Sequence, residues 1–142
     1  MGQTLKFTQS AFTEAHAFVT GTSSANTTYD ILSGNTLERR IYGISFSSTD
    51  AGAQTIKIYL NDGSSDYQLF TYSLVANAGN STTIAAADIF GDSKVAPVFQ
   101  KQRDSNGVPY FNLPVNWSVR FQYGTALTGA ETITTIVFGE VY

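Results

Sequence analysis

Apolar and polar residues alternate with a period of two along most of this chain, and this alternation constrains its fold more than any other feature. The clearest example is 55–60, where Ile56, Ile58 and Leu60 share one face. Successive side chains of a β-strand point to opposite faces, so such a segment fits a half-buried strand. Turn-forming residues such as those of 61–64 interrupt the alternation about every ten residues, a spacing typical of a sandwich or barrel. The sequence therefore predicts an all-β fold.

The predicted strands cover most of the chain, namely 4–8, 12–20, 29–32, 39–47, 55–60, 67–75, 95–100, 108–113, 117–123 and 132–141. The segment 84–90 is the one expected helix, and Pro97 suits an edge strand. We predict an antiparallel β-sandwich, preferably a jelly roll of about eight strands. An immunoglobulin-like sandwich is the alternative, because alternation does not distinguish the two.

Two of these strands carry specific predictions about their faces. Alternation over 39–47 places Ile41, Gly43 and Ser45 on one face, opposite Tyr42, Ile44 and Phe46. Alternation over 132–141 places Ile133, Val137 and Val141 on one face, opposite Thr134, Ile136 and Phe138.

The length of the chain fits one domain, predicted to span 1–142 as a single β-sandwich. Apolar residues make up 42% of the sequence, enough for one core. The segment 1–11 contains Leu5 and Phe7 among polar residues. It either forms the first strand of the domain or is an extended arm that pairs with a neighbour's sheet, and the sequence leaves both readings open.

Charge and targeting signals exclude several classes of protein. Net charge is −3, and Lys and Arg are not clustered, so nucleic acid and anionic membranes are not expected partners. No segment approaches the ~20 apolar residues of a membrane span. The N-terminus lacks the apolar run of a signal peptide, and there is no cysteine. We expect a protein that is made and folded in a cytoplasm.

The sequence offers little for catalysis or metal binding. His16 is the single histidine and lies near no nucleophile motif, so we expect no catalytic residues, no cofactor and no enzyme activity. Acidic and amide side chains cluster in two turns, at Asn61, Asp62, Ser64 and Asp66 and at Asp104 and Asn106. These residues favour tight turns for backbone reasons and lack the spacing of an EF-hand, so we predict turns rather than calcium sites.

Aromatic residues raise the question of carbohydrate binding. Four tyrosines could supply a sugar platform: Tyr59, Tyr67, Tyr110 and Tyr123. Trp117 alternates with Val119 and Phe121, and a large aromatic side chain in this pattern more often serves the core.

Two long segments of the chain carry distinctive strand and turn motifs. The first is RRIYGISFSSTDAGAQTIKIYLNDGSSDYQLF (39–70), with an Arg-Ile-x-Gly strand, a Ser-Thr-Asp-Ala turn and a Tyr-Leu strand. This pattern resembles a segment of small virion structural proteins of tailed bacteriophages. The second is DSNGVPYFNLPVNWSVRF (104–121), which looks like their Pro-Tyr and Leu-Pro hairpin, and the final ITTIVFGEVY is also similar. The resemblance covers most of the chain from Tyr29 onward, although the motifs are structural turns.

This resemblance implies a non-enzymatic capsid decoration or cement protein. Such a protein binds the major capsid protein, commonly as a trimer, and is located on the capsid surface after synthesis in the host cytoplasm. The candidate partner-binding residues are Leu5, Phe7, Arg39 and Arg40. The two arginines are adjacent and should point to opposite faces of their strand. The alternative is a carbohydrate- or receptor-binding module of a phage tail or head fibre.

Overall fold

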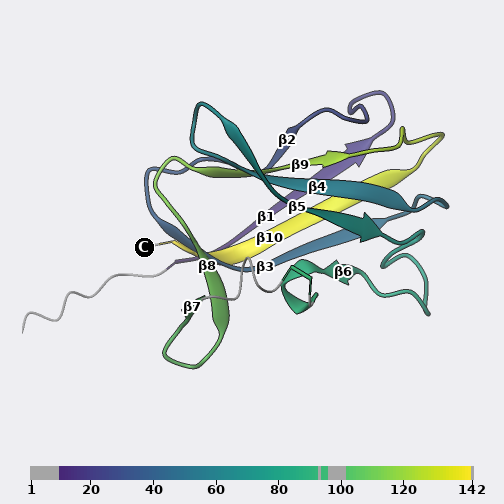
Figure 1. Ribbon diagram of the computed structural model, residues 1–142. Helices are drawn as coiled ribbons and strands as arrows, with labels where there is room; N and C mark the ends of the chain where they lie inside the picture. Colours follow the sequence, from purple (N-terminus) through teal and green to yellow (C-terminus); the bar gives the residue numbers. More distant parts are fainter. Residues whose placement is uncertain (1–9, 93, 96–101, 142) are drawn as a thin grey trace, which may run out of the picture.

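A computed structural model describes residues 10–92, 94–95 and 102–141 (Figure 1). Its elements, in chain order, are β1 (Ser10–Val19), β2 (Tyr29–Leu32), β3 (Arg39–Ser48), β4 (Gln54–Asn61), β5 (Asp66–Leu74), β6 (Ala87–Asp88), the 3-10 turn η1 (Ile89–Gly91), β7 (Gln102–Arg103), β8 (Pro109–Leu113), β9 (Ser118–Tyr123) and β10 (Thr132–Val141). No helix among the described residues is long and apolar enough to cross a membrane.

The strands form two antiparallel sheets with a jelly-roll order. One sheet runs β1-β10-β3-β8-β7, with β6 also paired to β3, and the other runs β2-β9-β4-β5. Strands of the first half of the chain therefore pair in reverse order with strands of the second half: β1 with β10, β2 with β9, β3 with β8, and β4 with β5. Successive pairs alternate between the sheets, as in a long hairpin rolled into a sandwich. This order confirms the jelly roll and differs from the immunoglobulin arrangement.

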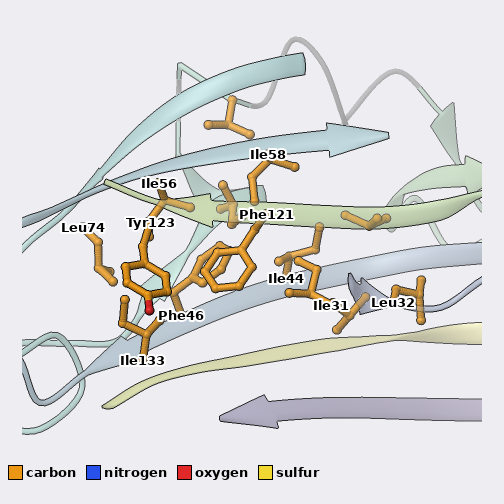
Figure 2. Packing of buried hydrophobic residues seen from close by; sticks show 14 of the residues in the cluster. Ile31, Leu32, Ile44, Phe46, Ile56, Ile58, Leu74, Phe121, Tyr123 and Ile133 are labelled. Carbon is orange, nitrogen blue, oxygen red and sulfur yellow. The ribbon is translucent and has the colours of Figure 1, made fainter. Parts of the chain in front are cut away.

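The core lies between the two sheets and follows the predicted alternation in most strands. In β4, Ile56 and Ile58 are fully buried and Leu60 nearly so, as expected. From β9, the ring of Phe121 enters the centre of the core (Figure 2). Its centroid lies 4.5 Å from that of Phe18 on β1, so this side chain connects the two layers.

The prediction for β3 was wrong for two residues, because Ile41 shares the face of Ile44 and Phe46 and Tyr42 does not. Ile41 was expected on the face opposite Ile44 and Phe46, yet all three are fully buried. The register between β3 and β10 shifts beside Tyr42, which has no partner on β10, so the strand contains a β-bulge. As a result, two residues, Tyr42 and Gly43, separate the inward-facing Ile41 and Ile44, where regular alternation would have one.

The predicted helix over 84–90 was also wrong. The chain there forms the short strand β6, paired with β3, followed by the turn η1. The Asp88 side chain accepts a hydrogen bond from the Phe90 N–H at 3.0 Å, and Ile89 and Phe90 are buried. A seven-residue segment is too short to stabilise a helix by itself, and burial of two large side chains decides its conformation. The predicted strands 4–8 and 95–100 lie wholly or mostly outside the described residues.

Candidate interaction surface

The outer face of the β2-β9-β4-β5 sheet is polar. Its centre is Arg120 on β9, which forms ion pairs with Asp30 at 2.9 Å and with Asp66 at 3.1 Å. Beside it, the Gln122 amide donates a hydrogen bond to the Thr28 hydroxyl. These side chains satisfy one another while they remain in contact with solvent, as expected of a face exposed to water.

The outer face of the β1-β10-β3 region has the opposite character. Alternation in β10 sends Thr134, Ile136 and Phe138 outward, as predicted, while Ile133 and Val137 are buried. The registers on both sides bring only small or uncharged residues next to them. We call this set the uncharged face: Ala11, Thr13, Ala15, Ala17, Gly43, Ser45, Ser47, Thr134, Ile136 and Phe138.

Ile136 and Phe138 are the two large side chains of the uncharged face. They are 37% and 45% exposed. Ile136 is flanked by Ala15 on β1 and Ser45 on β3, so its neighbours cannot cover it. Exposed apolar side chains that stand above small neighbours are typical of a protein contact surface.

Gly43, next to the bulge in β3, makes room for the Phe138 ring. Phe138 pairs with Gly43, and a side chain at Gly43 would collide with the ring, which therefore lies directly over the glycine. The absence of a side chain at Gly43 lets the ring lie flat against the backbone, an approach that only glycine allows.

A polar cluster borders the uncharged face at the β3–β8 end. The Arg40 guanidinium lies 4.5 Å from the centroid of the Tyr110 ring. The Tyr42 hydroxyl donates towards Glu140 at 3.3 Å and towards Asp104 at 3.4 Å. Burial raises the pKa of Tyr42; a hydrogen bond with Arg40 opposes this rise, and the two carboxylates reinforce it. The phenol therefore stays a hydrogen-bond donor at neutral pH.

The two adjacent arginines are on opposite sides of β3, as predicted. Arg40 lies at the border of the uncharged face, whereas Arg39 is only 3% exposed. The Arg39 guanidinium donates to the Trp117 carbonyl at 2.9 Å and lies 5.9 Å from the Phe12 ring centroid. Burial lowers the pKa of Arg39, and the Glu14 carboxylate opposes this change. Arg39 thus connects β3 to the turn that precedes β9.

Of the four candidate partner-binding residues, Arg40 alone is described at the surface. Leu5 and Phe7 lie outside the described residues, so their role stays a prediction. The alternation of 132–141 placed Ile136 and Phe138 together, but it did not identify them as a surface. A signal was present: both faces of this strand carry large apolar side chains, although a sandwich sheet has one core face.

His16 is not arranged as the base of a serine hydrolase. Its Nε2 lies 2.8 Å from the Glu14 carboxylate, on the same face of β1. The hydroxyl of Ser33 donates to the same carboxylate at 3.1 Å rather than to the imidazole. A nucleophilic serine must contact the imidazole, so this contact serves to attach the loop after β2 to β1.

The acidic turns use their oxygens internally. One Asp62 carboxylate oxygen accepts the N–H groups of Ser64 and Ser65 at 2.8 Å, and the other accepts the Tyr67 hydroxyl. The two backbone hydrogen bonds, with that of Tyr67, lower the pKa of Asp62. In the second turn, Asp104 accepts two backbone N–H groups in the same way. Among the described residues, no group of three or more metal-binding side chains occurs.

The aromatic residues considered for carbohydrate binding are dispersed. Tyr123 is in the core, where its hydroxyl contacts Ser23 at 2.7 Å. Tyr110 belongs to the border cluster on the other sheet. Tyr67 stacks on Trp117, with ring centroids 6.3 Å apart. Trp117 also packs against the core, in partial agreement with the prediction.

Comparison with solved structures gives a likeness in fold, whereas comparisons of the sequence give no match. No protein-family model matches the chain, and no curated protein matches its sequence. The chain is similar to a solved structure described as the cyanophage Pam1 capsid asymmetric unit, at 16% identity, covering 99% of this chain and 89% of that one, with a TM-score of 0.47.

Proposed function

We propose that this protein is a non-enzymatic structural component of a bacteriophage particle, namely a decoration or cement protein that binds and stabilises the lattice of the major capsid protein. It would be made in the host cytoplasm, act as a homo-oligomer, with a trimer favoured, and reside on the capsid surface. The resemblance of 39–70 and 104–121 to small phage virion proteins supports this proposal.

The uncharged face is the observation that carries the proposal. Jelly rolls also occur in lectins and cupins, so the fold does not select a function. The uncharged face, however, offers exposed Ile136 and Phe138 among small residues, whereas the opposite sheet carries an ion-pair network. Such asymmetry suits a protein with one side against a protein surface and the other in water.

The first experiment is a protein census of virus-sized particles from the source culture. A ratio to the main shell protein near one, or near a simple fraction, supports a lattice component. A few copies per particle would indicate a tail or fibre protein instead. Absence from the particles would contradict the proposal and favour the carbohydrate-binding alternative.

Binding to purified shells tests the uncharged face directly. The double variant I136T/F138T should bind at least about tenfold more weakly, because each large apolar side chain buried contributes about 1.5–3 kcal/mol. Its free energy of unfolding should change by less than about 1 kcal/mol, since both side chains are exposed. The matched control is V75T/V115T, which replaces two exposed apolar residues outside this face. Equal binding by both variants would show that another surface meets the shell.

A further inference from the structure

The outer edge of β1 differs from the other edges of the two sheets. β1 pairs with β10 on one side over its entire length, from Ser10 to Val19, with no register shift. At the edges of the other sheet, β2 is four residues long and irregular, and β5 contains a bulge. The edge strand β7 has two residues.

Of the features that protect an exposed edge, β1 has only an inward-facing carboxylate, that of Glu14. Natural edge strands avoid pairing with other chains by being short, by bulging, by carrying Lys, Pro or an inward-facing charge, or by being covered. β1 is ten residues long and regular, and its sequence, SAFTEAHAFV, contains neither Lys nor Pro. Its outward side chains are Ala11, Thr13, Ala15 and Ala17, which leave the backbone accessible to a second strand.

The sequence of β1 is complementary to itself when two copies run antiparallel. The central motif is Phe12-Thr-Glu-Ala-His-Ala-Phe18. If Ala15 lies opposite Ala15 of a second copy, Glu14 lies opposite His16, and Phe12 lies opposite Phe18. Carboxylate opposite imidazole and aromatic opposite aromatic are both favourable cross-strand pairs. A register shifted by two residues either way would place Glu14 opposite Glu14 or His16 opposite His16.

The side chains of this motif are available for such a contact. In the single chain, the Glu14 carboxylate lies 2.8 Å from the His16 Nε2 and also accepts the Ser33 hydroxyl. The Glu14 and His16 side chains stay 28% and 35% exposed, so a neighbouring strand can still contact both. Phe12 is half-buried at the core margin, and Phe18 is in the core. Pairing would therefore complete the cover of Phe12 while it satisfies the backbone groups on the β1 edge that have no strand partner in the described part of the chain.

We infer that two copies of this chain associate through antiparallel pairing of their β1 strands about a twofold axis at Ala15. The two β1-β10-β3 sheets become one continuous sheet, and the two uncharged faces lie side by side on it. This inference does not depend on the proposed virion role. In the trimer proposed above, the twofold contact joins neighbouring trimers rather than subunits of one trimer.

Disulfide trapping tests both the contact and its register. The sequence contains no cysteine, so an introduced residue is the sole thiol. In A15C, directly opposed residues have Cα atoms about 4.5–5.5 Å apart, within disulfide range. The matched control is T13C, on the same face, where the two thiols would be separated by four residues along the strand, about 13 Å. Mild oxidation of the full chain should yield a covalent dimer for A15C and none for T13C.

A mixture of T13C with A17C makes the register test stricter. Residues 13 and 17 lie opposite each other in the inferred pairing, so mixed dimers should form between the two variants but not within either one. A monomeric A15C would overturn the inference, as expected if another segment of the same chain covers the edge. Equal cross-linking of A15C and T13C would overturn the register, because it would indicate random collision. Neither result affects the particle census.

Discussion

At the scale of single residues, Gly43 and Gly139 show that the neighbouring group determines how much an added side chain would destabilise the protein. A Cβ atom at either glycine would collide with another group. At Gly43 the obstacle is the ring of Phe138, which is half-exposed and can rotate away. At Gly139 the obstacle is the backbone carbonyl of Arg40, within the β3–β10 ladder. Backbone in a paired sheet cannot move without loss of its hydrogen bonds.

These two glycines give a matched pair of predictions. Gly139→Ala should lower the free energy of unfolding by about 2–4 kcal/mol, since overpacking against rigid backbone is costly. Gly43→Ala should cost about 1 kcal/mol or less, because the exposed ring is displaced instead. Urea unfolding followed by circular dichroism measures both. Similar losses for the two variants would show that the ring is as fixed as the backbone.

At the same scale, Arg39 and Arg40 show that alternation predicts opposite faces for two neighbouring residues but not which of the two faces is buried. Alternation correctly placed them on opposite faces of β3. It did not reveal which face is covered, and Arg39 was considered a surface contact although its guanidinium is buried against Trp117 and Phe12. A long side chain with an apolar stem can be buried when a carbonyl oxygen accepts hydrogen bonds from its charged group. In Arg39 that carbonyl belongs to a residue distant in sequence.

At the scale of elements, β9 is central because it pairs on both sides, with β2 and with β4. Its Phe121 contacts rings from the other sheet, with centroids 4.5 Å away at Phe18 and 6.0 Å away at Phe46. This side chain therefore connects the two layers as well as filling the core.

Truncation of Phe121 tests this role. Phe121→Ala should lower the free energy of unfolding by about 3–5 kcal/mol, since the cavity lies where neither layer can collapse. The control Val115→Ala, at an exposed site, should change it by less than about 0.5 kcal/mol. Denaturant titration measures both. A loss near 1 kcal/mol for Phe121→Ala would indicate that the layers repack around the gap.

Elements also differ in how well the sequence predicts them. β4 and β10 follow simple alternation, and their buried faces agree with expectation. β3 departs from alternation at its bulge, for which the isolated Gly43 is a signal, although the pairing with β10 decides where the extra residue lies. The segment 84–90 has the composition of a helix, but its conformation depends on the burial of Ile89 and Phe90 against the sandwich. Local patterns fail where a distant partner decides the conformation.

At the scale of the whole molecule, the jelly roll pairs the two ends of the described chain. β1 lies beside β10, so Ser10 faces Val141, and β2 pairs with β9. Closing such large loops costs conformational entropy before the contacts compensate for it. Most of the sheet contacts share this non-local character.

We therefore expect slow folding for a chain of this size. Refolding from urea, followed by Trp117 fluorescence in a stopped-flow instrument, should occur over milliseconds to seconds, the range of β-sandwiches with non-local pairing. Folding in microseconds would contradict the observed topology, because local contacts would then have to dominate.

The sequence by itself determined the all-β class, the faces of most strands and the positions of many turns. It could do so because the period of two is a property of the extended backbone, and turn residues act on their own φ and ψ angles. Only the tertiary structure decided the jelly-roll order, the bulge in β3, the burial of Arg39 and the exposure of Ile136 and Phe138. Each of these depends on which distant strand lies alongside, and strand partners are chosen by packing over the whole sandwich rather than by neighbours in the chain.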